Sequence, residues 1–247
     1  MEYLLVIEKK RVMNNIVLEN IYYDGYYLGD FINNYFDRLP SICKINYDKN
    51  IKNTEIYLSD YGYYYFDGVI IYNNLWVLMH EVNHLASYDR DKDIDGICDQ
   101  DDNGIGLDDG VCEYMTMRMF NSDIPTTNYL EVFIVSILME INDFTECFYT
   151  ANFDKFISMF PNDKINSLIS DLDKYYYVNR DGIGIDEINL LVRDILDDLI
   201  DIMILFSSNS SKLKEYCSKF INLYDRYKER YILFNDIELK RYIRSKF

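Results

Sequence analysis

The chain has 247 residues, of which 42 are Asp or Glu and 25 are Lys or Arg, so its formal net charge is −17. This acidic surplus argues against nucleic acid as a partner, because phosphate binding needs clustered Lys and Arg, and it also argues against anionic membrane surfaces. The length and a hydrophobic content of 49% predict one large folded domain or a catalytic domain with a smaller companion.

The sequence features that report on the cellular compartment favour the cytoplasm. Residues 1–10 carry a short apolar run with an acid on each side, which does not match a secretory signal. The most apolar long stretch, 188–206, is interrupted by charged residues and does not match a transmembrane helix. The five cysteines contain no C-x-x-C pair, which is typical of free thiols in a reducing compartment. We expect a cytoplasmic protein that contacts no membrane, with export by a route that needs no signal peptide left open.

In chain order, residues 28–39 are expected to form a helix and residues 54–72 to form short strands, since the latter are rich in aromatic and β-branched side chains. From Leu75 the apolar residues recur with helical period, and Asn73 or Asn74 is placed to cap that helix. An acidic loop follows. Further helices are expected from Asp108 and over residues 129–142, 186–205 and 211–231.

This order of strands early and helices late predicts an α+β fold. We expect a catalytic unit over residues 1–125, with mixed strands and active-site helices. Residues 126–247 are expected to form a mainly α-helical half that packs on the first.

Residues 80–84 read His-Glu-Val-Asn-His, an H-E-x-x-H motif that contains both histidines of the chain. Two His four residues apart lie on the same face of a helix, where their imidazoles can hold one Zn²⁺. Glu81, directly after the first His, is placed to take a proton from a water that the metal activates. The motif therefore predicts that His80 and His84 bind zinc and that Glu81 is the general base. The alternative is a helix in which the two His only pack or form hydrogen bonds.

A catalytic zinc normally has three protein ligands, and since the chain has no third His the remaining ligand must be Asp, Glu or Cys. The segment 104–116 is the best source, because Asp109 and Glu113 lie four residues apart on one face of a predicted helix. One of these carboxylates can bind the metal while the other orients a ligand. The residues alone leave both assignments open.

Over residues 54–120 the chain resembles the gluzincin branch of the zincin metallopeptidases, in particular bacterial zincin-like proteins in which H-E-x-x-H is followed by Asn-Glu-Gly-x-x-Glu-Tyr. Residues 108–114 here read Asp-Asp-Gly-Val-Cys-Glu-Tyr. The resemblance implies a zincin-like unit of a small sheet and an active-site helix, a peptide or protein substrate, and a Tyr that stabilises the oxyanion. It also places Asp109 at the ligand position and Glu113 at the supporting one. Asp109 is one methylene shorter than the family's Glu, so Glu113 stays the alternative ligand.

The acidic loop contains D-x-D-x-D-G followed by D-x-D-x-N-G. Alternating carboxylates around a Gly turn are typical of calcium loops, although the bidentate Glu that closes an EF-hand is missing here. We therefore consider a Ca²⁺ site, beside the alternative of a solvated acidic insertion. Its candidate ligands are Asp91, Asp93, Asp95, Asp99, Asp101 and Asn103.

These observations together predict a zinc-dependent metallopeptidase that hydrolyses peptide bonds with a metal-activated water and Glu81 as the general base. The alternative is a non-catalytic binding or regulatory protein, stabilised by zinc or calcium, that retains the H-E-x-x-H motif.

Overall fold

The computed structural model describes residues 12–13, 22–23, 26–58, 63–65, 69–72, 74–181 and 185–207, and positions 211, 212, 214, 215, 218 and 222. Most of the predicted helix 211–231 therefore lies outside the described residues. The chain divides into two compact units, one made of Met1–Gly96 with Tyr149–Ala151, and the other of Ile97–Phe148 with Asn152–Phe247.

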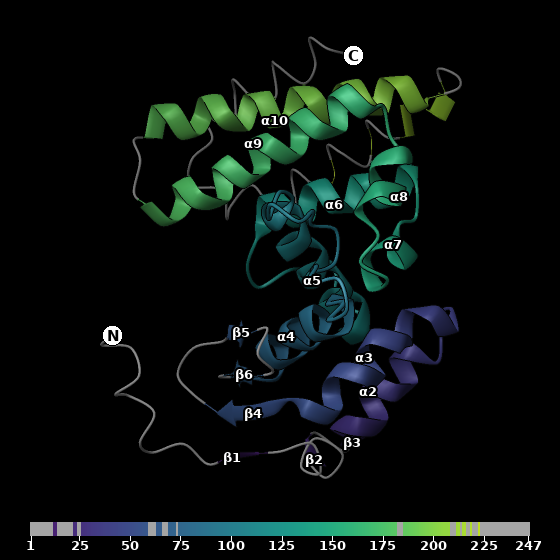
Figure 1. Ribbon diagram of the computed structural model, residues 1–247. Helices are drawn as coiled ribbons and strands as arrows, with labels where there is room; N and C mark the ends of the chain where they lie inside the picture. Colours follow the sequence, from purple (N-terminus) through teal and green to yellow (C-terminus); the bar gives the residue numbers. More distant parts are fainter. Residues whose placement is uncertain are drawn as a thin grey trace. The chain divides into compact units, whose positions relative to one another are not determined.

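Helices account for most of the described residues (Figure 1). Up to Ser87 they are α2 (Leu28–Phe36), α3 (Ile45–Asn50) and α4 (Leu75–Ser87), with the 3-10 turns η2 (Ser41–Lys44) and η3 (Ile51–Asn53). After the acidic loop they are α5 (Ile105–Phe120), α6 (Tyr129–Ile141), α7 (Thr145–Tyr149), α8 (Phe153–Ser158), α9 (Asn162–Asp181) and α10 (Ile185–Phe206). The strands are short: β1 (Val12–Met13), β2 (Tyr22–Tyr23), β3 (Tyr26–Tyr27), β4 (Glu55–Leu58), β5 (Tyr63–Tyr65) and β6 (Val69–Tyr72).

The α+β fold class predicted from the sequence is wrong, because the described part of the chain is mainly α-helical. The strands pair in the order β1-β4-β6-β5 and as a β2-β3 hairpin, but each is only two to four residues long. The described residues of the hydrophobic core lie mainly on helices. The expected zincin-like unit built on a small sheet is therefore replaced by a helical core.

In the first unit, α4 follows β6 in the chain and packs against α3. The side-chain amide of Asn50, fully buried on α3, donates to the carbonyl oxygens of Leu85 at 2.8 Å and Tyr88 at 2.7 Å. Carbonyls at a helix C-terminus have no partner within the helix itself. α3 thus stabilises the end of α4 directly after the H-E-x-x-H motif.

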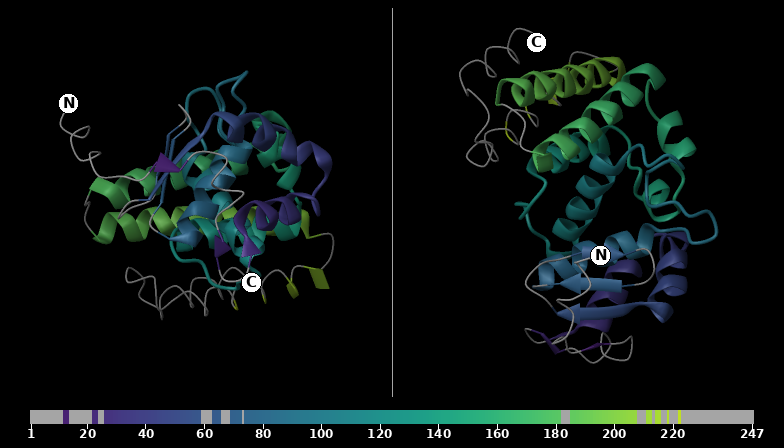
Figure 2. Two further views of the ribbon diagram at one scale, coloured as in Figure 1. Left: turned by 90° about the horizontal axis from the view of Figure 1, so that it is seen from below. Right: turned by 60° about the vertical axis from the view of Figure 1, so that its left-hand side comes forward.

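In the second unit, α9 and α10 lie side by side, as both views of Figure 2 show. The ammonium group of Lys164 on α9 lies 3.3 Å from an Asp198 carboxylate oxygen and 2.7 Å from one of Asp201 on α10. We find no apolar stretch that could span a lipid bilayer in any helix that the structure describes.

The start of α5 is fixed by a carboxylate from α9. Gly104 is the N-cap of α5 and has no side chain to accept from the free N–H groups of the first turn. The Asp173 carboxylate accepts instead from the backbone N–H of Gly104 at 2.7 Å and of Gly106 at 2.9 Å. Burial raises the pKa of Asp173 above its usual value, although these two hydrogen bonds lower it. The helix that carries Asp109 and Glu113 is therefore positioned at its first turn by α9.

Candidate metal centre

The H-E-x-x-H motif lies on α4, as the sequence predicts. The side chain of Asn74 caps this helix by accepting from the backbone N–H of Val77 at 3.0 Å, which confirms one of the two predicted caps. His80 and His84 lie one turn apart, with ring centroids separated by 5.1 Å and ring planes at 63°. His80 is 8% exposed and the neighbouring Glu81 is also 8% exposed. Two imidazoles at this spacing on one helix face can share one metal ion.

His84 has a carboxylate partner that the sequence analysis assigned to a different role. Its Nδ1 lies 3.2 Å from Oδ2 of Asp95, and the Ser87 hydroxyl donates to Oδ1 of the same carboxylate at 2.9 Å. Asp95 stands in the acidic loop, where the sequence predicted a calcium ligand. The sequence signal for this contact is weak, since the two residues are eleven positions apart and the chain between them is irregular after α4 ends at Ser87.

Asp109 and Glu113, the two candidates for the third ligand, have different surroundings on α5. Oδ2 of Asp109 accepts from the side-chain amide of Asn128 at 2.9 Å. Oε1 of Glu113, which is 1% exposed, accepts from the backbone N–H of Thr126 at 2.6 Å, from the Thr126 hydroxyl at 3.1 Å and from the N–H of Thr127 at 3.2 Å. Glu113 thus binds the turn that precedes α6, a contact that sequence spacing alone does not predict.

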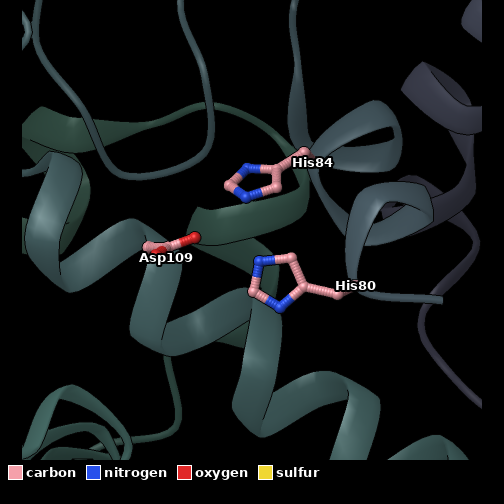
Figure 3. A group of neighbouring side chains, drawn as sticks. All are labelled: His80, His84 and Asp109. Carbon is pink, nitrogen blue, oxygen red and sulfur yellow. The ribbon is translucent and has the colours of Figure 1, made fainter. Parts of the chain in front are cut away.

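Figure 3 shows His80, His84 and Asp109, each of which offers one ligand atom within 4.8 Å of those of the other two. Two imidazole nitrogens and one carboxylate oxygen are a donor set that suits a catalytic zinc ion. A second group of possible ligands combines His84 with Asp108 and Cys112. Asp108 in this group also accepts from the backbone N–H of Ile97 at 2.9 Å. Neither Asp108 nor Cys112 was expected from the sequence to bind the metal, because neither stands at the ligand position of the resembled motif.

The predicted calcium ligands of the first half of the loop each have a protein partner. Asp91 forms an ion pair with Lys49 at 2.7 Å, and Asp93 accepts from the Tyr88 hydroxyl. Burial, followed by this hydrogen bond, raises the pKa of Tyr88 to about 12. These contacts bind the loop to α3 and to the end of α4.

The second half of the loop forms a compact turn of its own. Oδ1 of Asp99 accepts from the backbone N–H of Asp101 at 2.9 Å and of Asn103 at 3.0 Å, and its Oδ2 accepts from the Asn103 amide at 2.8 Å. Asp101 and Asn103 are exposed. Binding of Ca²⁺ by these residues stays a prediction.

One further carboxyl group lies close to Asp109. Glu131 on α6 is 4% exposed, and its backbone and Cβ lie against Gly110 of α5. Burial raises the pKa of Glu131 to about 7, and the charge of Asp109 adds to the rise. Glu131 is therefore expected to be largely protonated below neutral pH.

Compared with known proteins, the chain matches no protein-family profile, no curated protein and no solved structure.

Proposed function

We propose that the protein is a zinc-dependent metallopeptidase that hydrolyses peptide bonds in peptides or proteins. The observation that carries this proposal is the pair of neighbouring imidazoles on α4, His80 and His84, with Glu81 beside the first. Two His and a following Glu at this spacing are the elements that metal-assisted peptide hydrolysis needs.

We propose His80, His84 and Asp109 as the zinc ligands. Asp109 is favoured over Glu113 because the resemblance to the gluzincin pattern implies that Asp109 stands at the ligand position. The three hydrogen bonds that Glu113 accepts through Oε1 favour a structural role for it at the turn before α6. Asn128 supports the choice, since its amide orients the Asp109 carboxylate.

In the proposed reaction Glu81 acts as the general base and then as the general acid. A bound Zn²⁺ supplies a Lewis acid, which polarises the substrate carbonyl and lowers the pKa of water. The Glu81 carboxylate takes the proton of the attacking water and delivers it to the leaving amine. The low exposure of Glu81 favours this role, because a carboxylate shielded from bulk water keeps its proton available for the amine.

We place the protein in the cytoplasm. The four cysteines whose surroundings the structure describes, Cys43, Cys98, Cys112 and Cys147, are buried thiols that form no disulfide. Cysteines kept as thiols are typical of a reducing compartment.

The first experiment measures zinc in the purified protein and in three variants, His84→Ala, Asp109→Ala and Glu113→Ala. We expect about one Zn²⁺ per chain in the wild type and a loss of zinc in the first two variants. Zinc retained in Asp109→Ala but lost in Glu113→Ala would exchange the roles of these two carboxylates. No zinc in the wild type after reconstitution would refute the proposed function.

The second experiment tests catalysis with Glu81→Gln and fluorescently labelled casein as the probe. The substitution keeps the size of the side chain but removes its basic oxygen, so we expect cleavage to fall by about 10²-fold or more while zinc stays bound. Glu140→Gln, at an exposed position of α6, is the matched control and should cleave like the wild type. Equal cleavage by Glu81→Gln and the wild type would contradict the mechanism. If zinc is bound but neither the wild type nor Glu140→Gln cleaves casein, the result would favour a structural role for the metal.

A further inference from the structure

We infer that Asp95 is a positioning residue for His84, which it orients for metal binding through the contact between its carboxylate and the Nδ1 atom of the imidazole. This inference rests on the proposed function, because it assigns a partner to one of the proposed zinc ligands. The contact measures 3.2 Å, and the two side chains are 16% and 11% exposed. An imidazole–carboxylate contact shielded to this degree is stronger than one on an open surface.

Directly after α4 ends, the chain folds back against the end of this same helix. An isolated antiparallel bridge joins Asp89 to Ile94, with the N–H of Asp89 donating to the Ile94 carbonyl at 2.8 Å. The next residue after this bridge is Asp95. The short loop therefore places the Asp95 carboxylate against the last turn of the same helix that carries His80 and His84.

The contact determines which nitrogen of His84 can bind a metal. A carboxylate only accepts hydrogen bonds, so the neutral His84 ring meets Asp95 with a proton on Nδ1. The other nitrogen, Nε2, then carries the lone pair that a metal needs. The negative charge of Asp95 also makes Nε2 a better electron donor, as carboxylate partners do for other metal-binding His residues.

The carboxylate itself is oriented by a second contact. The Ser87 hydroxyl, fully buried on the last turn of α4, donates to Oδ1 of Asp95 at 2.9 Å. Oδ2 is thereby directed to the imidazole. Both oxygens of Asp95 have protein partners on α4, an arrangement that fits a positioning residue.

Asp93 offers a matched comparison within the same loop. It stands two residues before Asp95 and bonds the Tyr88 hydroxyl rather than a histidine. Removing its charge changes the net charge and the loop contacts to a similar extent, but leaves His84 and Asp95 in place. Asp93→Asn is therefore the control that separates a local charge effect from the effect of the His84 contact.

The test measures the dissociation constant for Zn²⁺ by competition with a chromophoric chelator, in the wild type, Asp95→Asn, Asp95→Ala and Asp93→Asn. We expect Asp95→Ala to bind zinc about 10- to 100-fold more weakly than the wild type, and Asp95→Asn to fall between them because the amide oxygen still accepts from Nδ1. Asp93→Asn should bind like the wild type. The visible absorption of the Co²⁺-substituted protein should change in both Asp95 variants, since it reports on ligand geometry.

The outcomes separate this inference from the function on which it rests. Zinc absent from the wild type would overturn both. Zinc bound with equal affinity by the wild type and by both folded Asp95 variants would overturn the inference alone. An equal loss in Asp93→Asn and Asp95→Asn would also overturn it, because the effect would then come from the loop charge.

A third variant covers the case in which the Asp95 variants do not fold, as judged by circular dichroism. Ser87→Ala removes the hydroxyl that lies 2.9 Å from Oδ1 of Asp95 and 3.1 Å from the His84 carbonyl oxygen, but keeps both Asp95 and His84. Zinc affinity about threefold or more below that of the wild type would support the inference. Unchanged affinity would overturn it.

Discussion

Asn83 stands between Glu81 and His84 in the motif, yet it takes part in the core of the first unit. It is fully buried, its side-chain amide donates to the Met79 carbonyl at 3.0 Å, and its Oδ1 accepts from the Tyr149 hydroxyl at 2.7 Å. Tyr149 is among the largest fully buried side chains that the structure describes. The x positions of H-E-x-x-H are thus structural here, and Asn83 anchors the helix from which the proposed ligands extend.

We therefore expect Tyr149→Phe to lower the free energy of unfolding by about 1–2 kcal/mol, because Asn83 loses a donor in a place that water does not reach. The measurement is urea denaturation followed by circular dichroism. Tyr129→Phe is the matched control, since its hydroxyl donates to the Thr126 carbonyl in an exposed bond, and it should cost about 0.5 kcal/mol or less. Equal losses in the two variants would contradict a special role for the buried bond.

The sequence was sufficient for some residues of the candidate site and insufficient for others. His80, Glu81 and His84 follow from a short spacing on one helix, where local geometry determines which side chains share a face. The contact of Asp95 with His84 cannot be predicted in this way, because the position of Asp95 depends on the path of an irregular loop. Neither can the contact of Asp109 with Asn128, which joins residues nineteen positions apart.

At the scale of secondary structure, the packing of α5 against α6 depends on the absence of a side chain at Gly110. A Cβ atom built there would lie 2.7 Å from the Cβ of Glu131 and 2.9 Å from its backbone carbonyl carbon. Real Cβ atoms do not approach backbone atoms so closely. Gly110 follows Asp109 directly, so the close approach of the two helices also determines where the proposed ligand lies.

We expect Gly110→Ala to destabilise the protein by about 1–3 kcal/mol, as overpacking of a tight contact does, despite the better helix propensity of Ala. The control is Ser170→Ala, at an exposed position within α9, where the same new residue should change stability by only a few tenths of a kcal/mol. Urea denaturation measures both. If Gly110→Ala were as stable as the wild type, α5 and α6 would have to be packed less tightly than the structure shows.

The helices that have a clear apolar period were predictable, and α3 was not. Its buried positions are Asn46, Tyr47 and Asn50, and because two of these three are Asn the apolar pattern is lost. These amides are buried because they donate to backbone carbonyls, as Asn46 does to Tyr149 at 3.2 Å. The run 54–72 does form the predicted short strands, β4, β5 and β6, but helices make up most of the described residues, so the fold is mainly α-helical.

At the scale of the whole molecule, stability is expected to rise as the pH falls from 7.5 towards 5. The net charge is −17 at pH 7, so the surplus carboxylates repel one another in the compact state. As the pH falls towards the sequence pI near 4.4, protonation of carboxylates reduces this repulsion. The buried carboxyl of Glu131 acts in the same direction. The two contributions can be separated, because one is spread over the surface and the other resides in a single side chain.

Burial raises the pKa of Glu131 from 4.5 to about 7 in the folded protein. Below pH 4.5 the group is neutral in both states, and between these values the folded state binds more protons than the unfolded state. Stability from this group is therefore complete below about pH 4.5 and is lost as the pH rises through about 7. The full loss amounts to about 3 kcal/mol.

Glu131→Gln removes this titration while keeping a neutral side chain of similar shape. We expect the variant to be within about 1 kcal/mol of the wild type near pH 5 and more stable than the wild type by about 3 kcal/mol at pH 7.5. Urea denaturation at both pH values, with EDTA present so that no metal contributes, gives the two differences. Glu140→Gln, which removes an exposed charge, should shift stability by a similar small amount at both values. A gap between Glu131→Gln and the wild type that did not change with pH would mean that Glu131 ionises normally, and the acidic surface would then account for the pH dependence alone.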